Sequence, residues 1–150
     1  MKILVCIDCS IESQKALEEA AIIARGCNVA EVTVIHVYKA VLDSTFPFTR
    51  EGITQDQMKS FKNIMGVRKE NKKNILAEAE KYLKEKDIKT QTILKEGHPA
   101  ESIVNLAKKE GFDMIVLGNR GLGGLQKAFL GSVSNAIIQQ AENCSVLVVK

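Results

Sequence analysis

Short apolar runs that suit β-strands alternate with helical patterns along all 150 residues of the chain. The run from Ile3 to Ile7 is continuous, the pattern of a strand covered on both faces of a parallel sheet. The run over 89–94 alternates polar and apolar residues, which places it toward a sheet edge. The alternation of strand and helix patterns along the chain is typical of one open α/β sheet with helices on both faces. We predict strands over about 2–8, 32–38, 89–94, 114–117 and 145–149.

The helical patterns between these strands have recognisable ends. Ser10 is a suitable N-cap for a helix that ends at Gly26, and Pro99 suits the first turn of a later one. The segment 39–55 has no clear period, so we expect a loop or short lid there. We predict helices over about 10–26, 64–85, 99–111 and 132–141.

Composition excludes several classes of protein. The 45% hydrophobic and 26% charged residues suit an ordinary folded domain, and no apolar run approaches the roughly 18 residues of a membrane span. A net charge of +3 is too small to indicate nucleic acid without a localised basic patch. Only five apolar residues separate Lys2 from Asp8, too few for a secretory leader. We therefore expect one cytoplasmic domain over 1–150, with no nucleic-acid or membrane partner.

Two of the four cysteines, Cys6 and Cys9, have the CxxC spacing of redox pairs and zinc sites. Cys6 lies in a predicted strand, where three residues span about 10 Å, beyond the reach of a disulfide. No second CxxC or HxxxH completes a zinc site. We therefore interpret these cysteines as reduced thiols.

The segment from Gly118 to Ser132 carries the most chemical information. Four of the chain's 10 glycines lie between 118 and 124, directly after a predicted strand, where successive N–H groups can form an anion-binding nest. Gly131 and Ser132 then open a helix, whose N-terminus attracts phosphate. A flexible turn with Ser132 as an ordinary helix cap remains the alternative.

Two common phosphate motifs do not fit this segment. A Walker A loop needs a lysine directly after its second glycine, but Gly123 is followed by Gly124. A dinucleotide fingerprint would place its last glycine at Gln126, and it follows the first strand of its unit. In open α/β sheets ligands bind beyond the carboxyl ends of strands, where strand order reverses, so Asp8 is a further candidate. Its alternative role is to cap the following turn.

The spacing of Gly118, Gly121 and Gly131-Ser132 resembles the G-2x-G-9x-G-(S/T) signature of the universal stress protein family. The similarity continues through 3–10, 97–100 and 146–149. It implies the strand order 3-2-1-4-5 and, in the subgroup with this signature, bound ATP with Mg²⁺. By resemblance, Asp8 would face the ribose and metal-phosphate side and the Val37 backbone the adenine edge. The backbone positions implied for the phosphates are Gly118, Gly121, Gly131, Ser132 and Val133.

The resemblance also implies a stress-linked regulatory module whose partner binding depends on nucleotide, and a homodimer through the last strand. No residue set for hydrolysis is visible, so we expect at most a slow ATPase. Two alternatives stay open. One is a dimeric scaffold of the same fold without nucleotide, and the other is a flavodoxin-like or receiver domain.

Overall fold

The computed structural model describes residues 1–39, 71–121 and 130–150. These residues form one five-stranded sheet in the order β3-β2-β1-β4-β5, and every neighbouring pair is parallel. The α/β class and the expected 3-2-1-4-5 order are confirmed. A flavodoxin-like or receiver domain has the order 2-1-3-4-5, so that alternative is wrong. The strands are β1 (Ile3–Cys6), β2 (Glu31–Tyr38), β3 (Lys89–Glu96), β4 (Met114–Gly118) and β5 (Ser145–Val149).

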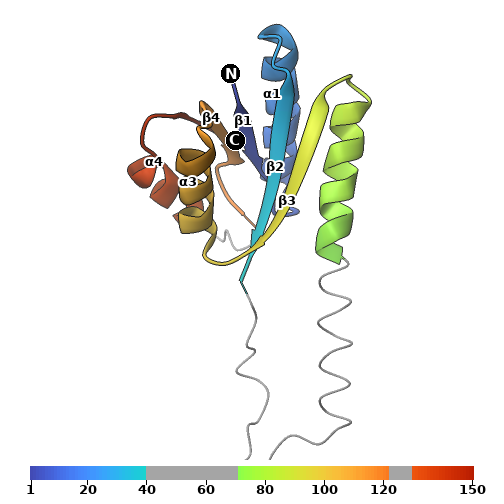
Figure 1. Ribbon diagram of the computed structural model, residues 1–150. Coiled ribbons are helices and arrows are strands. Elements are labelled where there is room, and N and C mark those ends of the chain that lie inside the picture. The colour runs from blue at the N-terminus through green and yellow to red at the C-terminus, as the bar shows by residue number, and fades with distance from the viewer. Residues whose placement is uncertain (40–70, 122–129) are drawn as a thin grey trace, which may run out of the picture.

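Helices cover both faces of the sheet (Figure 1). α1 (Ile11–Gly26) and the helix over 71–84 pack on one face, and α3 (Pro99–Glu110) and α4 (Ser132–Gln140) pack on the other. Among the described residues, no helix combines the length and apolar character that crossing a bilayer requires.

The helix ends follow the predicted capping signals. Ser10 Oγ accepts a hydrogen bond from the Ser13 N–H at 3.1 Å and caps α1, which ends at Gly26. Pro99 is the first residue of α3, and Gly111 ends that helix with a left-handed φ of 66°. The predicted ends of these two helices, at 10 and 26 and at 99 and 111, are therefore confirmed.

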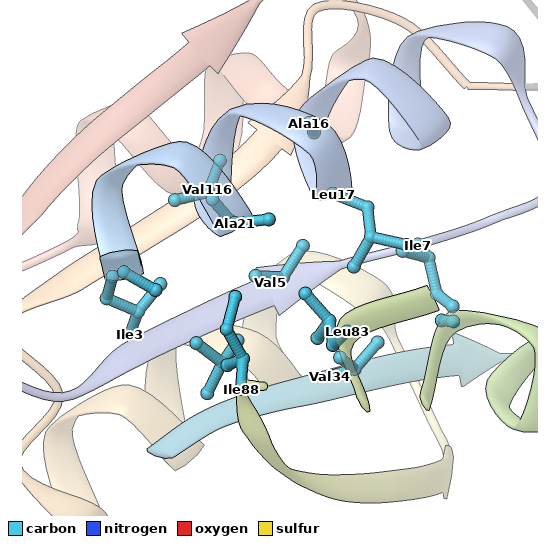
Figure 2. Close-up of a cluster of buried hydrophobic side chains, with 14 of the residues drawn as sticks. Ile3, Val5, Ile7, Ala16, Leu17, Ala21, Val34, Leu83, Ile88 and Val116 are labelled. Carbon is cyan, nitrogen blue, oxygen red and sulfur yellow. The ribbon is translucent and has the colours of Figure 1, made fainter. Parts of the chain in front are cut away.

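Alternate residues of β1 enter two hydrophobic clusters. Ile3 and Val5 face α1 and the helix over 71–84, whereas Leu4 faces α3 and α4, and all three side chains are fully buried. Figure 2 shows the first cluster, which gathers between α1, the sheet and the helix over 71–84. A central strand buried on both faces explains the continuous apolar run.

The two outer strands also behave as their patterns predict. β3 is only partly covered, in agreement with its alternating sequence. It continues to Glu96, past the predicted end at Leu94, because it pairs with β2 as far as Tyr38. β5 coincides with the predicted 145–149 and forms the opposite edge of the sheet.

Some predicted features lie outside the described residues. These are the loop or lid at 39–55 from residue 40 onward, the first part of the helix over 64–85, and residues 122–129 of the glycine-rich segment. The turn after β1 and both ends of the glycine-rich segment are described, and they meet at the point where strand order reverses.

Candidate functional site

The turn after β1 holds Asp8 through its neighbours. One carboxylate oxygen, Oδ1, accepts hydrogen bonds from the Ser10 hydroxyl and, at 3.1 Å, from the Ser10 N–H. The Asp8 N–H donates to Ser13 Oγ at 3.3 Å, and Cys9 takes a left-handed φ of 71°. Asp8 therefore has the capping role that we considered, but that role uses only Oδ1. Within the described residues, no hydrogen bond reaches Oδ2.

Two glycines of the signature allow different close approaches. A Cβ on Gly118 would lie 2.7 Å from the carbonyl carbon of Glu12, in the first turn of α1. A Cβ on Gly121 would overlap Oδ2 of Asp8. Gly118 thus lets α1 pack closely on the end of β4, and Gly121 leaves room for the carboxylate.

The first turn of α4 has no side-chain cap. Gly131 is the N-cap residue and Ser132 is the first helical residue, so the alternative of Ser132 as an ordinary cap is wrong. The helical hydrogen bonds begin with the Asn135 N–H, which donates to the Gly131 carbonyl at 2.9 Å. The N–H groups of Ser132 and Val133 precede this bond and have no acceptor within the helix.

The Gly131 N–H itself is not available. It donates to the Asn119 carbonyl at 2.7 Å, which ties the start of α4 to the residue that follows β4. The amide that we expected to hold phosphate is therefore used within the fold in this structure, and the available donors begin at Ser132. The sequence reasoning also missed Ser134, whose hydroxyl donates to the Gly118 carbonyl at 2.8 Å and fixes the same turn. Only its position in the first helical turn could have indicated this role.

These elements surround a cavity of about 340 Å³ at the carboxyl edge of the sheet, on the face that α3 and α4 cover. Sites for small molecules have volumes of roughly 300–1,000 Å³. Apolar walls come from β2, β4 and α3, through Ile35, Leu117 and Ile103. All seven predicted site residues line this cavity: Asp8, Val37, Gly118, Gly121, Gly131, Ser132 and Val133.

The backbone of Val37 faces the gap beyond the end of β1. The Ile7 N–H donates to the Ile35 carbonyl at 3.0 Å, so the peptide groups of Ile35 point toward β1. Strand geometry repeats every two residues, and the peptide groups of Val37 therefore point the same way. The Ile7 carbonyl, which would be their next partner, instead accepts from His36 Nδ1 at 2.7 Å. The buried His36 ring thus binds the carbonyl group that would otherwise be the next partner of Val37.

Cys6 also lines the cavity. Burial and, to a smaller extent, the charge of Asp8 raise the pKa of its thiol, which stays protonated at neutral pH. All four cysteines are free thiols. Across 1–39, 71–121 and 130–150, no group of three His, Cys, Asp or Glu side chains is placed to hold a metal ion.

A model of the universal stress protein family matches residues 1–150. The chain belongs to this family. Universal stress protein YxiE of Bacillus subtilis is 36% identical over 149 residues, which cover 99% of this chain and 98% of that protein. The solved structure of MJ0577, a universal stress protein of Methanocaldococcus jannaschii, has a TM-score of 0.77 at 29% identity. It covers 99% of this chain and 94% of that one.

Two further structures of the family contain an adenine nucleotide. A universal stress protein in complex with cAMP has a TM-score of 0.65 at 23% identity and covers 99% of this chain and 95% of its own. An Arabidopsis thaliana family member with AMP bound has a TM-score of 0.64 at 20% identity and covers 100% and 91%. At these identities the likeness to this chain is one of fold.

Proposed function

We propose that this universal stress protein binds an adenine nucleotide, ATP together with Mg²⁺, in the cavity at the carboxyl edge of the sheet. The observation that carries the proposal is the uncapped first turn of α4 in the cavity wall. Its N–H groups at Ser132 and Val133 carry the positive end of the helix dipole, a common binding site for phosphate. The Ser132 hydroxyl adds a further donor beside them.

The other end of the cavity suits the base. Ile35 and Ile103 offer apolar walls for a flat ring, and the Val37 peptide groups present a donor and an acceptor next to them. Adenine carries an N6 amino donor beside a ring-nitrogen acceptor, so its edge complements such a pair. The apolar end and the phosphate end thus match the two ends of one nucleotide.

Asp8 fits the middle of the ligand. Its Oδ2 is available to accept from a ribose hydroxyl or to approach a cation that the phosphates hold. Mg²⁺ commonly binds one or two carboxylates together with substrate phosphates. A single acidic side chain among the described cavity residues therefore fits a cation that arrives with the nucleotide.

The ligand class has independent support. The family members solved with cAMP and AMP hold adenine nucleotides on the same fold. The preference for ATP depends on the glycine signature from Gly118 to Ser132.

We assign the protein a regulatory role, with at most slow hydrolysis. Phosphoryl transfer needs an oriented water and groups that stabilise the developing charge. Among the described cavity residues, Asp8 is the one acidic side chain and Arg120 the one basic side chain, so no second carboxylate remains to orient the water if Asp8 approaches the cation. A regulatory output requires a partner whose affinity differs between the bound and empty forms. We place this stress-linked role in the cytoplasm.

Dimerisation through β5 is a further part of the proposal. β5 is an outer strand, so one side of its backbone lacks a partner strand within the described sheet. Pairing with the β5 of a second copy would cover this edge. Analytical ultracentrifugation should show a dimer at micromolar concentration, and a monomer alone would refute this part.

A Gly131 pair of variants tests the site. Gly131→Glu should abolish binding of Mg-ATP in isothermal titration calorimetry, because it brings a negative charge to the phosphate end. Gly131→Ala is the matched control, since its Cβ would lie 3.1 Å from the Asn119 carbonyl oxygen and 3.3 Å from the Arg120 Cα, contacts that require these backbone atoms to move by a few tenths of an ångström. Both should keep wild-type helicity. Unchanged affinity in Gly131→Glu would move the site elsewhere. If the wild type binds no Mg-ATP and releases no nucleotide on heat denaturation, the scaffold alternative holds.

A further inference from the structure

A second cavity, of about 260 Å³, lies on the opposite face of the sheet between α1 and the helix over 71–84. It meets the first cavity only at the turn after β1, through Ile7 and Ser13, which line both. Figure 2 shows Ile7 and Leu17 at the end of the hydrophobic cluster that borders it. Nothing in the proposed nucleotide site uses this space.

The second cavity has an apolar floor and a negative rim. Leu17 and Ala79 are buried in its floor. Glu18 of α1 and Glu78 of the facing helix are exposed on its rim. No lysine or arginine is among the described residues that line it.

The basic side chains nearest in sequence to these two glutamates are engaged elsewhere. Lys15, one turn before Glu18 in α1, donates to the Lys150 carbonyl at 3.3 Å. Lys81, one turn after Glu78, lies 3.9 Å from Glu85. Within the described residues, neither Glu18 nor Glu78 has an ion-pair partner. Among the described residues, the rim therefore carries two negative charges without an ion-pair partner.

Two neighbouring groups respond to this environment. The pKa of the Cys9 thiol is raised by partial burial, then by the charge of Asp8, and then by that of Glu78. The Tyr82 ring, which also lines the cavity, already has Lys86 Nζ at 4.7 Å from its centroid. Lys86 thus already supplies the cation that this aromatic ring attracts.

We propose that this second cavity binds a small organic cation, an ammonium group attached to an apolar body. The body would occupy the floor at Leu17 and Ala79, and the ammonium group would lie between Glu18 and Glu78. Both glutamates are exposed, so their attraction is screened by salt and the affinity should fall as ionic strength rises. The proposal does not depend on nucleotide binding in the first cavity.

Three probes with one apolar body and different charge test this assignment by NMR. Benzylammonium, benzyl alcohol and benzoate are titrated into the full chain labelled with ¹⁵N, with and without Mg-ATP. Benzylammonium should shift the amide signals of Cys9, Gln14 and Ala79 saturably in both conditions. It should also bind with a lower dissociation constant than benzyl alcohol. Benzoate should leave them unchanged. Equal binding of benzoate, or shifts confined to the first cavity, would overturn the proposal.

A charge-neutral double variant completes the test. Glu18→Gln with Glu78→Gln should weaken benzylammonium binding by about three- to tenfold, as expected for two exposed charges. Glu80→Gln is the matched control, because Glu80 pairs with Lys84 at 2.6 Å and does not line this cavity. Its affinity should equal that of the wild type. Equal affinity in the double variant would exclude the two glutamates as the recognition element.

Discussion

Gly118→Ala should destabilise the protein through the packing of α1 on β4. The new Cβ would lie 2.7 Å from the Glu12 carbonyl carbon, 2.8 Å from the Glu12 Cβ and 3.0 Å from its carbonyl oxygen. Two of these atoms belong to the backbone and the third is attached to it, so none can rotate away, and the first turn of α1 must move. Overpacking of this kind costs about 1–3 kcal/mol. In a protein of this length each kcal/mol lowers Tm by about 2–4 °C, and we expect a loss of about 2–12 °C.

Thermal unfolding followed by circular dichroism at constant pH measures this effect, and urea unfolding gives the free energy. Gly26→Ala is the control, because nothing lies within 4 Å of its added Cβ at the end of α1. Alanine is the better helix residue by about 0.5–1 kcal/mol, so this variant should melt at or slightly above the wild-type temperature. If Gly118→Ala melts together with Gly26→Ala, the close approach of α1 does not limit this position.

Four further measurements test the residues around the first cavity and the cysteines. Gly121→Ala displaces the Asp8 carboxylate and should weaken Mg-ATP binding about tenfold or more in calorimetry, with little change in Tm. Ser134→Ala leaves a buried carbonyl unpaired and should lower the unfolding free energy by about 1–3 kcal/mol in urea. The raised pKa of Cys6 stabilises the folded state below the ordinary thiol pKa of about 8.5 and loses that effect as pH rises further. Stability should therefore fall above this pH, and Cys6→Ala should flatten the fall. Mass spectrometry after treatment with iodoacetamide should detect labelling of the exposed Cys27 well before labelling of Cys6.

The elements of the fold follow from local sequence patterns. The apolar run at Ile3 marks a strand with neighbours on both sides, and the alternating residues before Leu94 mark an edge strand. Ser10 and Gly111 delimit helices through their own hydroxyl group or backbone freedom. Each of these signals acts within a few residues, so one sequence is enough to interpret it. The strand order came from family resemblance, and the structure confirms it.

The roles of the individual glycines depend on residues far away in the chain. Gly118 meets the start of α1, Gly121 meets Asp8, and the Gly131 N–H meets the Asn119 carbonyl. Their spacing indicated a phosphate cradle but contained no information on which amides the fold would use for itself. The second cavity could not be predicted from local sequence either, because its two glutamates come from helices that are separated by β2 in sequence.

The most direct test of the nucleotide site follows the backbone amides of α4 during a titration with Mg-ATP. In ¹H–¹⁵N spectra, the N–H signals of Ser132 and Val133 should shift saturably and with one common dissociation constant. The Gly131 signal should move less, because its N–H already donates to Asn119. If saturating Mg-ATP leaves the Ser132 and Val133 amides unmoved, or binds with shifts elsewhere, the uncapped end of α4 is not the phosphate site.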